Sequence, residues 1–176
     1  MNESHGMIVF GANGSGKTTL GRELARILNF KRMDVEDYYF NESEIPYANS
    51  RSRDEVINLM LADIEKYGSF VISAVNGDFG DKITLFYKLG VYLSAPLELR
   101  LERVKRRAYQ QYGDRVLKGG DMYEQEQKFF DFVANRDLSG IDEWAETLTC
   151  PVIRVDGTAD WRINAVNIAE QFLKLI

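Results

Sequence analysis

The sequence predicts an α/β protein in three layers, with a five-stranded parallel sheet between two layers of helices. The first observation behind this prediction is that short apolar runs alternate with longer stretches whose apolar residues have helical spacing. The second is the segment 70–75, whose almost continuous apolar character is typical of a central strand buried on both faces. Neighbouring parallel strands need a crossover connection, and the helical stretches supply these crossovers.

The strands are predicted from the short apolar runs, taken in chain order. The first run precedes a glycine-rich segment, the second ends in acidic residues, and the third is the central strand described above. The predicted strands are residues 7–10, 31–35, 70–75, 90–93 and 152–155. In such sheets ligands bind beyond the carboxyl ends of the strands, so the segments that follow the strands are the first place to look for a site.

The helices are predicted from apolar residues three or four positions apart. In residues 17–28, for example, Leu20, Leu24 and Leu28 fall on one face. Pro96 favours a helix start, because the first turn does not need its missing N–H. The predicted helices are residues 17–28, 53–66, 83–88, 96–109, 124–134, 141–146 and 159–175.

Length and composition predict one domain that spans residues 1–176, with 45% hydrophobic and 28% charged residues. The net charge of −5 argues against a nucleic-acid partner, and no apolar stretch approaches the ~20 residues of a membrane span. Cys150 is the single cysteine and His5 the single histidine, so we expect neither a disulfide within the chain nor a zinc site. With no visible signal peptide, we expect a cytoplasmic protein that is a monomer or a homodimer.

Residues 11–18 read Gly-Ala-Asn-Gly-Ser-Gly-Lys-Thr and match the phosphate-binding pattern G-x-x-x-x-G-K-[ST] between a strand and a helix. Glycines let the backbone wrap around phosphate oxygens, and the start of the following helix adds its positive dipole end. Lys17 is expected to reach the β- and γ-phosphates, Thr18 to ligate Mg²⁺, and Thr19 to contact the α-phosphate. The predicted nucleotide-binding residues here are Gly11, Asn13, Gly14, Ser15, Gly16, Lys17, Thr18 and Thr19.

A phosphate loop is compatible with a GTPase, an ATPase machine or a small-molecule kinase. The chain lacks an Asn-Lys-x-Asp guanine motif, and its central strand does not end directly in Asp-Glu. The sequence therefore favours an ATP- and Mg²⁺-dependent transfer of the γ-phosphoryl group to a small-molecule acceptor. The alternative from another class is a regulatory ATP-binding or ATPase module that acts through a protein partner.

An acidic segment follows the second predicted strand, at residues 33–39. Carboxylates at this edge of the sheet would face the magnesium and the γ-phosphate. Asp37 is the candidate to orient or deprotonate an acceptor hydroxyl, and Asp34 is the candidate magnesium partner, although the two roles can be exchanged. The alternative is a solvated acidic turn.

Five arginines lie within sixteen residues of this acidic chain: Arg100, Arg103, Arg106, Arg107 and Arg115. Arg103 and Arg107 are four residues apart and share one helix face, where they are suited to stabilise a transferring phosphoryl group. We expect Arg100 and Arg106 to lie instead on a solvated face, paired with glutamates of the same helix.

The order of these motifs resembles the adenylate-kinase-like branch of P-loop kinases, which includes nucleoside-monophosphate, shikimate and gluconate kinases. More narrowly, the chain is similar to bacterial proteins labelled "AAA family ATPase" or "adenylate-kinase-related", a label that fixes no substrate. The matching stretches are Asp-Val-Glu-Asp-Tyr-Tyr at 34–39, Pro46-Tyr47 with Arg51, Gly-Gly-Asp-Met at 119–122 and the segment 150–157.

The resemblance implies the P-loop NTPase fold with strand order 2-3-1-4-5 and a helical lid inserted at about residues 108–136. A lid of this kind brings arginines to the phosphates and excludes water. The residues that it implies are Arg115 in the lid, Arg103 and Arg107 before it and Arg136 after it, Gly157 near the adenine, and Tyr47, Arg51, Asp78, Asp37 and Arg136 around the acceptor.

The acceptor stays open, because residues 75–80 contain neither the arginine usual in nucleoside-monophosphate kinases nor the glycine run of shikimate kinases. The sequence favours a nucleotide or nucleoside acceptor over a sugar acid or another hydroxylated metabolite. A toxin or an antibiotic-modifying kinase would differ only in the acceptor. Outside the site, we expect Trp161 to pack between helices and residues 124–128 to form a solvated helix face.

Overall fold

The computed structural model describes residues 3–40 and 49–176. Its sheet has five parallel strands in the order β2-β3-β1-β4-β5, as the sequence and its resemblance predict. The strands are β1 (Gly6–Phe10), β2 (Lys31–Asp34), β3 (Phe70–Ala74), β4 (Tyr87–Ser94) and β5 (Val152–Asp156). The strands β1 and β3 are buried along their whole length. Because β1 is the middle strand of the sheet, its carboxyl end lies at the middle of the sheet edge.

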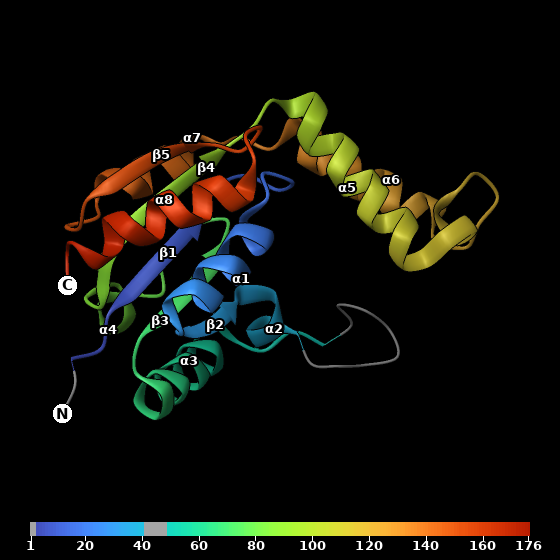
Figure 1. Ribbon diagram of the computed structural model, residues 1–176. Helices are drawn as coiled ribbons and strands as arrows, with labels where there is room; N and C mark the ends of the chain where they lie inside the picture. The colour runs from blue at the N-terminus through green and yellow to red at the C-terminus, as the bar shows by residue number, and fades with distance from the viewer. Residues whose placement is uncertain (1–2, 41–48) are drawn as a thin grey trace.

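Helices cover both faces of the sheet (Figure 1). Side chains of β1 alternate between the two faces, with Met7 and Val9 in the core under α1 and α8, and Ile8 and Phe10 in the core under α3, α4 and α7. The helices of these layers are α1 (Lys17–Leu28), α3 (Arg53–Tyr67), α4 (Asp81–Thr84), α7 (Ser139–Glu146) and α8 (Trp161–Leu173). The prediction of helices on both faces is therefore confirmed.

One local prediction was wrong. The helix expected at 83–88 ends at Thr84, and Tyr87 already belongs to β4, where its ring is buried and its hydroxyl donates to Gly77 O over 3.1 Å. The acidic segment after β2, for which no helix was predicted, forms the short helix α2 (Val35–Tyr39). Asp34 caps α2, because its carboxylate accepts from the Glu36 N–H.

A helical arm projects from the sheet beyond the carboxyl end of β4 (Figure 1). We call it the lid arm; it consists of α5 (Leu97–Tyr112), the 3₁₀ turn η1 (Gly113–Val116) and α6 (Tyr123–Asn135). Its two helices pack through a small core of their own, formed by Val104, Ala108, Val116, Phe130 and Val133 together with Met122. The arm thus has a hydrophobic core separate from the two cores that flank the sheet.

In the part of the chain that the structure describes, the helices are all too short or too polar to cross a membrane.

Candidate active site

The loop between β1 and α1 folds as the motif requires. Gly11, Gly14 and Gly16 have positive φ angles of 146°, 80° and 102°, which residues with a side chain rarely adopt. At Gly14 a Cβ atom would also lie 2.4 Å from Arg100 O, a sub-van der Waals distance. The glycines therefore serve two needs, the backbone conformation and the close approach of α5.

Two arginines of the lid arm hold this loop from outside. Arg100 is buried and donates to Ala95 O over 3.1 Å and to Asn13 O over 3.3 Å. Arg103 donates to Ser15 O over 3.2 Å and to Gly157 O over 2.8 Å. The expectation of a solvated Arg100 was wrong, because α5 turns this residue toward the loop and away from water. Arg103 is thus engaged with main-chain oxygens of Ser15 and Gly157, and it also lines the cavity described next.

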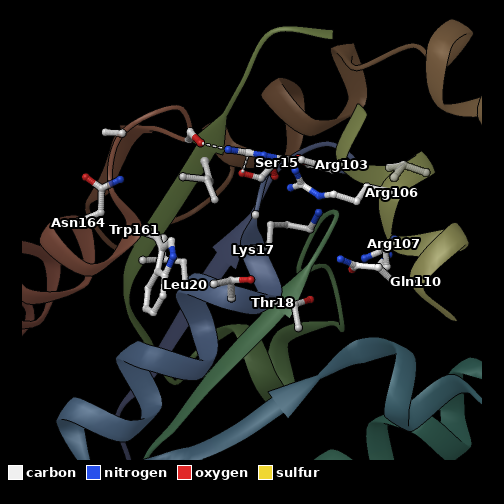
Figure 2. Close-up of a pocket in the computed structure, with 17 residues that line it drawn as sticks. Ser15, Lys17, Thr18, Leu20, Arg103, Arg106, Arg107, Gln110, Trp161 and Asn164 are labelled. Carbon is white, nitrogen blue, oxygen red and sulfur yellow. Dashed lines mark hydrogen bonds between the residues drawn. The ribbon is translucent and has the colours of Figure 1, made fainter. Parts of the chain in front are cut away.

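A cavity of about 400 Å³, the first cavity, lies beside the loop (Figure 2). Lys17 and Thr18 lie at its centre, Arg107 and Gln110 on one side, and Trp161 and Asn164 on the other. Its lining residues include Gly14, Ser15, Gly16, Lys17, Thr18, Thr19, Leu93, Arg103, Arg106, Arg107, Gly157, Ala159, Trp161 and Asn164. The predicted loop residues 14–19 and Gly157 thus share one cavity.

Trp161 was assigned to helix packing from the sequence, yet it lines the first cavity at the end away from Arg107. The Arg162 guanidinium lies over its ring, 4.3 Å from the centroid. The sequence signal that could have placed Trp161 in the cavity is its position shortly after Gly157. Asp160 caps α8 and so fixes where the first helical residue points. An aromatic face at this end of the cavity is suited to stack on a base.

Positive charge converges at the centre of the site. The Lys17 ammonium donates to Ala12 O over 2.9 Å. Burial, followed by the nearby Arg107 and more weakly Arg136, lowers the pKa of Lys17 to about 8, although Glu36 and Asp34 oppose the shift. A buried lysine with arginine charges nearby is the arrangement expected where a polyanion is to be bound.

The loop fits a phosphate group and a hard metal ion on its own geometry. The Ser15 hydroxyl is fully buried and has no hydrogen-bond partner within the described residues, so its oxygen can form a hydrogen bond with a bound phosphate. The Thr18 hydroxyl donates to the buried Asp34 carboxylate over 2.9 Å. A hydroxyl and a carboxylate at the carboxyl end of β2 are the oxygen donors that Mg²⁺ prefers, so Thr18 and Asp34 fit the predicted metal site.

The other carboxylates of α2 are placed differently from the expectation. Asp37 is exposed, lies 3.7 Å from Arg32, and lines neither this cavity nor the one described next. Glu36 lines the second cavity beside Asn13 and Arg107. Desolvation raises the pKa of Glu36, and the neighbouring charge of Asp34 adds to the shift. The sequence analysis missed Glu36 because the spacing does not reveal which carboxylate α2 turns toward the loop.

The second cavity, of about 380 Å³, lies between α2 and the inner side of the lid arm. Arg107 lines both cavities and so joins them. The described residues around it are Asn13, Glu36, Phe40, Val104, Arg107, Ala108, Gln111, Tyr112, Gln125, Glu126 and Phe129. Glu126 is buried, so the prediction that residues 124–128 form a solvated face was wrong for this residue.

The remaining predicted residues lie outside the two cavities. Arg136 donates to the Asn13 side chain over 3.1 Å, and Arg51 donates to Tyr38 O over 2.8 Å. Asp78 lies 3.6 Å from Arg53, and Arg115 forms a 2.7 Å ion pair with Asp121 at the exposed tip of the arm. Arg106 does line the first cavity, but it is exposed and pairs with Glu102 at 3.6 Å, as expected for a solvated residue.

Tyr47, predicted to contact the acceptor, lies outside the described residues.

Comparison with known proteins gives three findings. The sequence profile of the family described as "AAA domain" matches residues 7–129. An uncharacterized protein of Bacillus subtilis, YqaC, is 30% identical over 84% of this chain and 86% of its own length. A shikimate kinase of Clostridium botulinum is also 30% identical, over 82% of this chain and 86% of its length.

Among solved structures, a candidate kinase from Chloroflexus aurantiacus superposes with a TM-score of 0.68 over 99% of this chain and all of its own, at 15% identity. At this identity the likeness establishes the fold alone. The fold is that of the P-loop small-molecule kinases, as the resemblance predicts.

Proposed function

Since the chain belongs to the AAA domain family of P-loop proteins, we propose that it is a kinase that transfers the γ-phosphoryl group of ATP to a hydroxyl of a small molecule, with Mg²⁺. The observation that carries this proposal is Arg107, which lines both the first cavity beside Lys17 and the second cavity beside Glu36. A group transfer between two bound molecules needs positive charge where the two cavities meet, and Arg107 supplies it there.

In this proposal the first cavity holds the nucleotide. The main-chain amides of the loop and Lys17 bind the phosphates, and Trp161 stacks on the base. A bound Mg²⁺ would be held through Thr18 and Asp34 and would supply positive charge to the phosphate oxygens. Arg107 then balances the negative charge that spreads over the equatorial oxygens during transfer.

The acceptor occupies the second cavity and presents a hydroxyl toward Arg107. Its oxygen forms a bond to the γ-phosphorus while the bond from that phosphorus to the bridging oxygen breaks, and ADP leaves with this oxygen. Glu36 takes the hydroxyl proton, because among the described carboxylates of α2 it is the one that lines the second cavity. Asp37 keeps an electrostatic role through Arg32.

The test is phosphorylation of an acceptor panel with Mg-ATP, scored by product mass, by the wild type and by Lys17→Ala. The panel contains nucleosides, nucleoside monophosphates, shikimate, gluconate and aminoglycosides. We expect a product that Lys17→Ala reduces by at least about 100-fold, since Lys17 contacts the transferred group. Lys128→Ala, on an exposed face of the lid arm, serves as the control and should keep wild-type turnover. Equal turnover by Lys17→Ala would refute the scheme.

A regulatory ATP-binding module acting through a protein partner is the second candidate. The two arginines that tie the lid arm to the phosphate loop favour it, because they connect the nucleotide-binding loop directly to the helices of the projecting arm. Such a module would bind Mg-ATP but phosphorylate no member of the panel, and a macromolecule would stimulate its hydrolysis of ATP.

A further inference from the structure

The residues that line the second cavity indicate what kind of acceptor it can bind, which the sequence motifs do not. It lies between α2 and the two helices of the lid arm, and part of its lining is apolar. Phe40 contributes from the end of α2, Val104 and Ala108 from α5, and Phe129 from α6. Apolar and aromatic side chains in the lining favour a ligand with a flat or ring-shaped apolar face.

The polar lining is acidic on balance. Glu36 and Glu126 face the cavity from α2 and α6, and Arg107 is the single basic residue among the described residues that line it. Arg107 also lines the first cavity, so it is shared with the nucleotide phosphates. Once phosphates engage Arg107, two carboxylates face the acceptor with no dedicated cation opposite them. The undescribed segment 41–48 contains no lysine or arginine that could supply one.

The two arginines that the family resemblance implies around the acceptor, Arg51 and Arg136, make other contacts. Arg51 donates to Tyr38 O and so braces the end of α2. Arg136 donates to the Asn13 side chain, and its guanidinium lies 5.3 Å from the centre of the Phe132 ring. Neither lines the second cavity. A carboxylate or phosphate placed there would meet like charges in a partly desolvated space, which is unfavourable.

Glu126 is the most informative of these residues. It is buried, with 9% of its surface exposed, although it lies on the outer arm of a small protein where most charged residues are solvated. Desolvation raises the pKa of Glu126, while the charge of Arg107 opposes this shift. A buried carboxylate at a cavity wall is suited to accept hydrogen bonds from hydroxyl or ammonium groups of a ligand.

We infer that the phosphoryl acceptor is a neutral or amine-bearing hydroxylated ring compound, and that the second cavity discriminates against carboxylate- and phosphate-bearing acceptors. This inference rests on the proposed function. Glu126 acts as the specificity-determining residue by binding hydroxyl or amino groups, with the amides of Gln111 and Gln125 as further polar contacts at the same cavity. Phosphoryl transfer to a hydroxyl of this ligand follows the balance of bonds and protons given above.

The test uses pairs of probes that differ in charge: adenosine and AMP, methyl shikimate and shikimate, and glucosamine and gluconate. Binding of each probe is measured by calorimetry on the full chain, with a non-hydrolysable ATP analogue and Mg²⁺ present. We expect the neutral or amine-bearing member of at least one pair to bind about tenfold or more tightly than its acidic partner. Glu126→Gln should reduce that preference several-fold by weakening the favoured member and relieving the repulsion of the acid.

Glu124→Gln is the matched control, because Glu124 lies on the same helix but is exposed. It should leave the preference unchanged. The inference is overturned if the acidic members bind as tightly as their partners, if no probe binds, or if both variants behave alike. The kinase proposal fails separately: a probe that binds with the expected preference but is not phosphorylated in a Lys17-dependent reaction refutes the kinase and leaves the selectivity of the cavity standing.

Discussion

The two cavities are built from different parts of the chain, and this difference decides what a sequence reveals about each. The first cavity is formed around main-chain groups of a glycine-rich loop, with Lys17 and Thr18 at fixed positions after it. The second is formed by side chains from α2, α5 and α6, which meet only in the folded protein. A site built from main-chain groups needs a fixed local spacing of residues, which is visible in the sequence as a motif. A site built from side chains of separate helices has no such motif in the sequence.

If the first cavity is a main-chain site, its loop should not tolerate a side chain at Gly14. We expect Gly14→Ala to weaken nucleotide binding by more than about 100-fold and to destabilise the fold by roughly 2–4 kcal/mol, since the new Cβ would strain a positive φ and meet Arg100 O. Calorimetric binding and thermal unfolding measure the two effects. Gly140→Ala is the control, because it adds the same methyl group to open space in α7 and should stabilise by about 0.5 kcal/mol.

The side-chain site is tested most directly by two neighbouring carboxylates of α2. We expect Glu36→Gln to lower kcat on the order of 100-fold, because Glu36 takes the acceptor proton, and Asp37→Asn to change kcat by less than about threefold. Steady-state kinetics measures both variants, with an acceptor that the panel experiment shows to be phosphorylated. The reverse order of effects would return the role of base to Asp37.

A smaller effect comes from the titration of Lys17. In the free protein the pKa of Lys17 is lowered to about 8, chiefly by burial and then by Arg107. Bound phosphates stabilise the charged form, so binding requires the proton, and affinity should fall by about fivefold as the pH rises from 8 to 9. Affinities of Mg-ATP measured across this range check the sign. Lys17→Arg, which stays charged, should give a flat profile; an unchanged slope in that variant would assign the titration to another group.

The smallest effect is expected at the tip of the lid arm. Arg115 pairs with Asp121, and both side chains are mostly exposed, so Arg115→Ala should leave the midpoint of denaturation nearly unchanged. Chemical denaturation of Arg115→Ala and Asp121→Ala measures this. A loss of kcat above about tenfold in Arg115→Ala alone would show that the arm brings this arginine to the phosphates, as the family resemblance implies.

The parallel sheet and the bounds of α1 could be predicted, because most strands are short apolar runs and the phosphate loop fixes where α1 begins, whereas the strand order came from the family resemblance. The helix expected at 83–88 was too long because the apolar run of β4 begins at Leu89, while Tyr87 belongs to the strand and is buried by tertiary packing. The place of Arg100 was hidden, since helical spacing gives a face but not what that face meets. Glu36 and Glu126 come together at the second cavity only through tertiary packing of α2 against the lid arm.

The ties between the lid arm and the phosphate loop have a mechanical consequence. Arg100 and Arg103 grip loop carbonyls at the base of α5, and Arg136, just past the end of α6, grips the Asn13 side chain. From this base α5 runs 16 residues outward, about 24 Å. Because the contacts to the loop are all at the base of the arm, a rotation of α5 about this base would displace the far end several times further than the residues beside the phosphates.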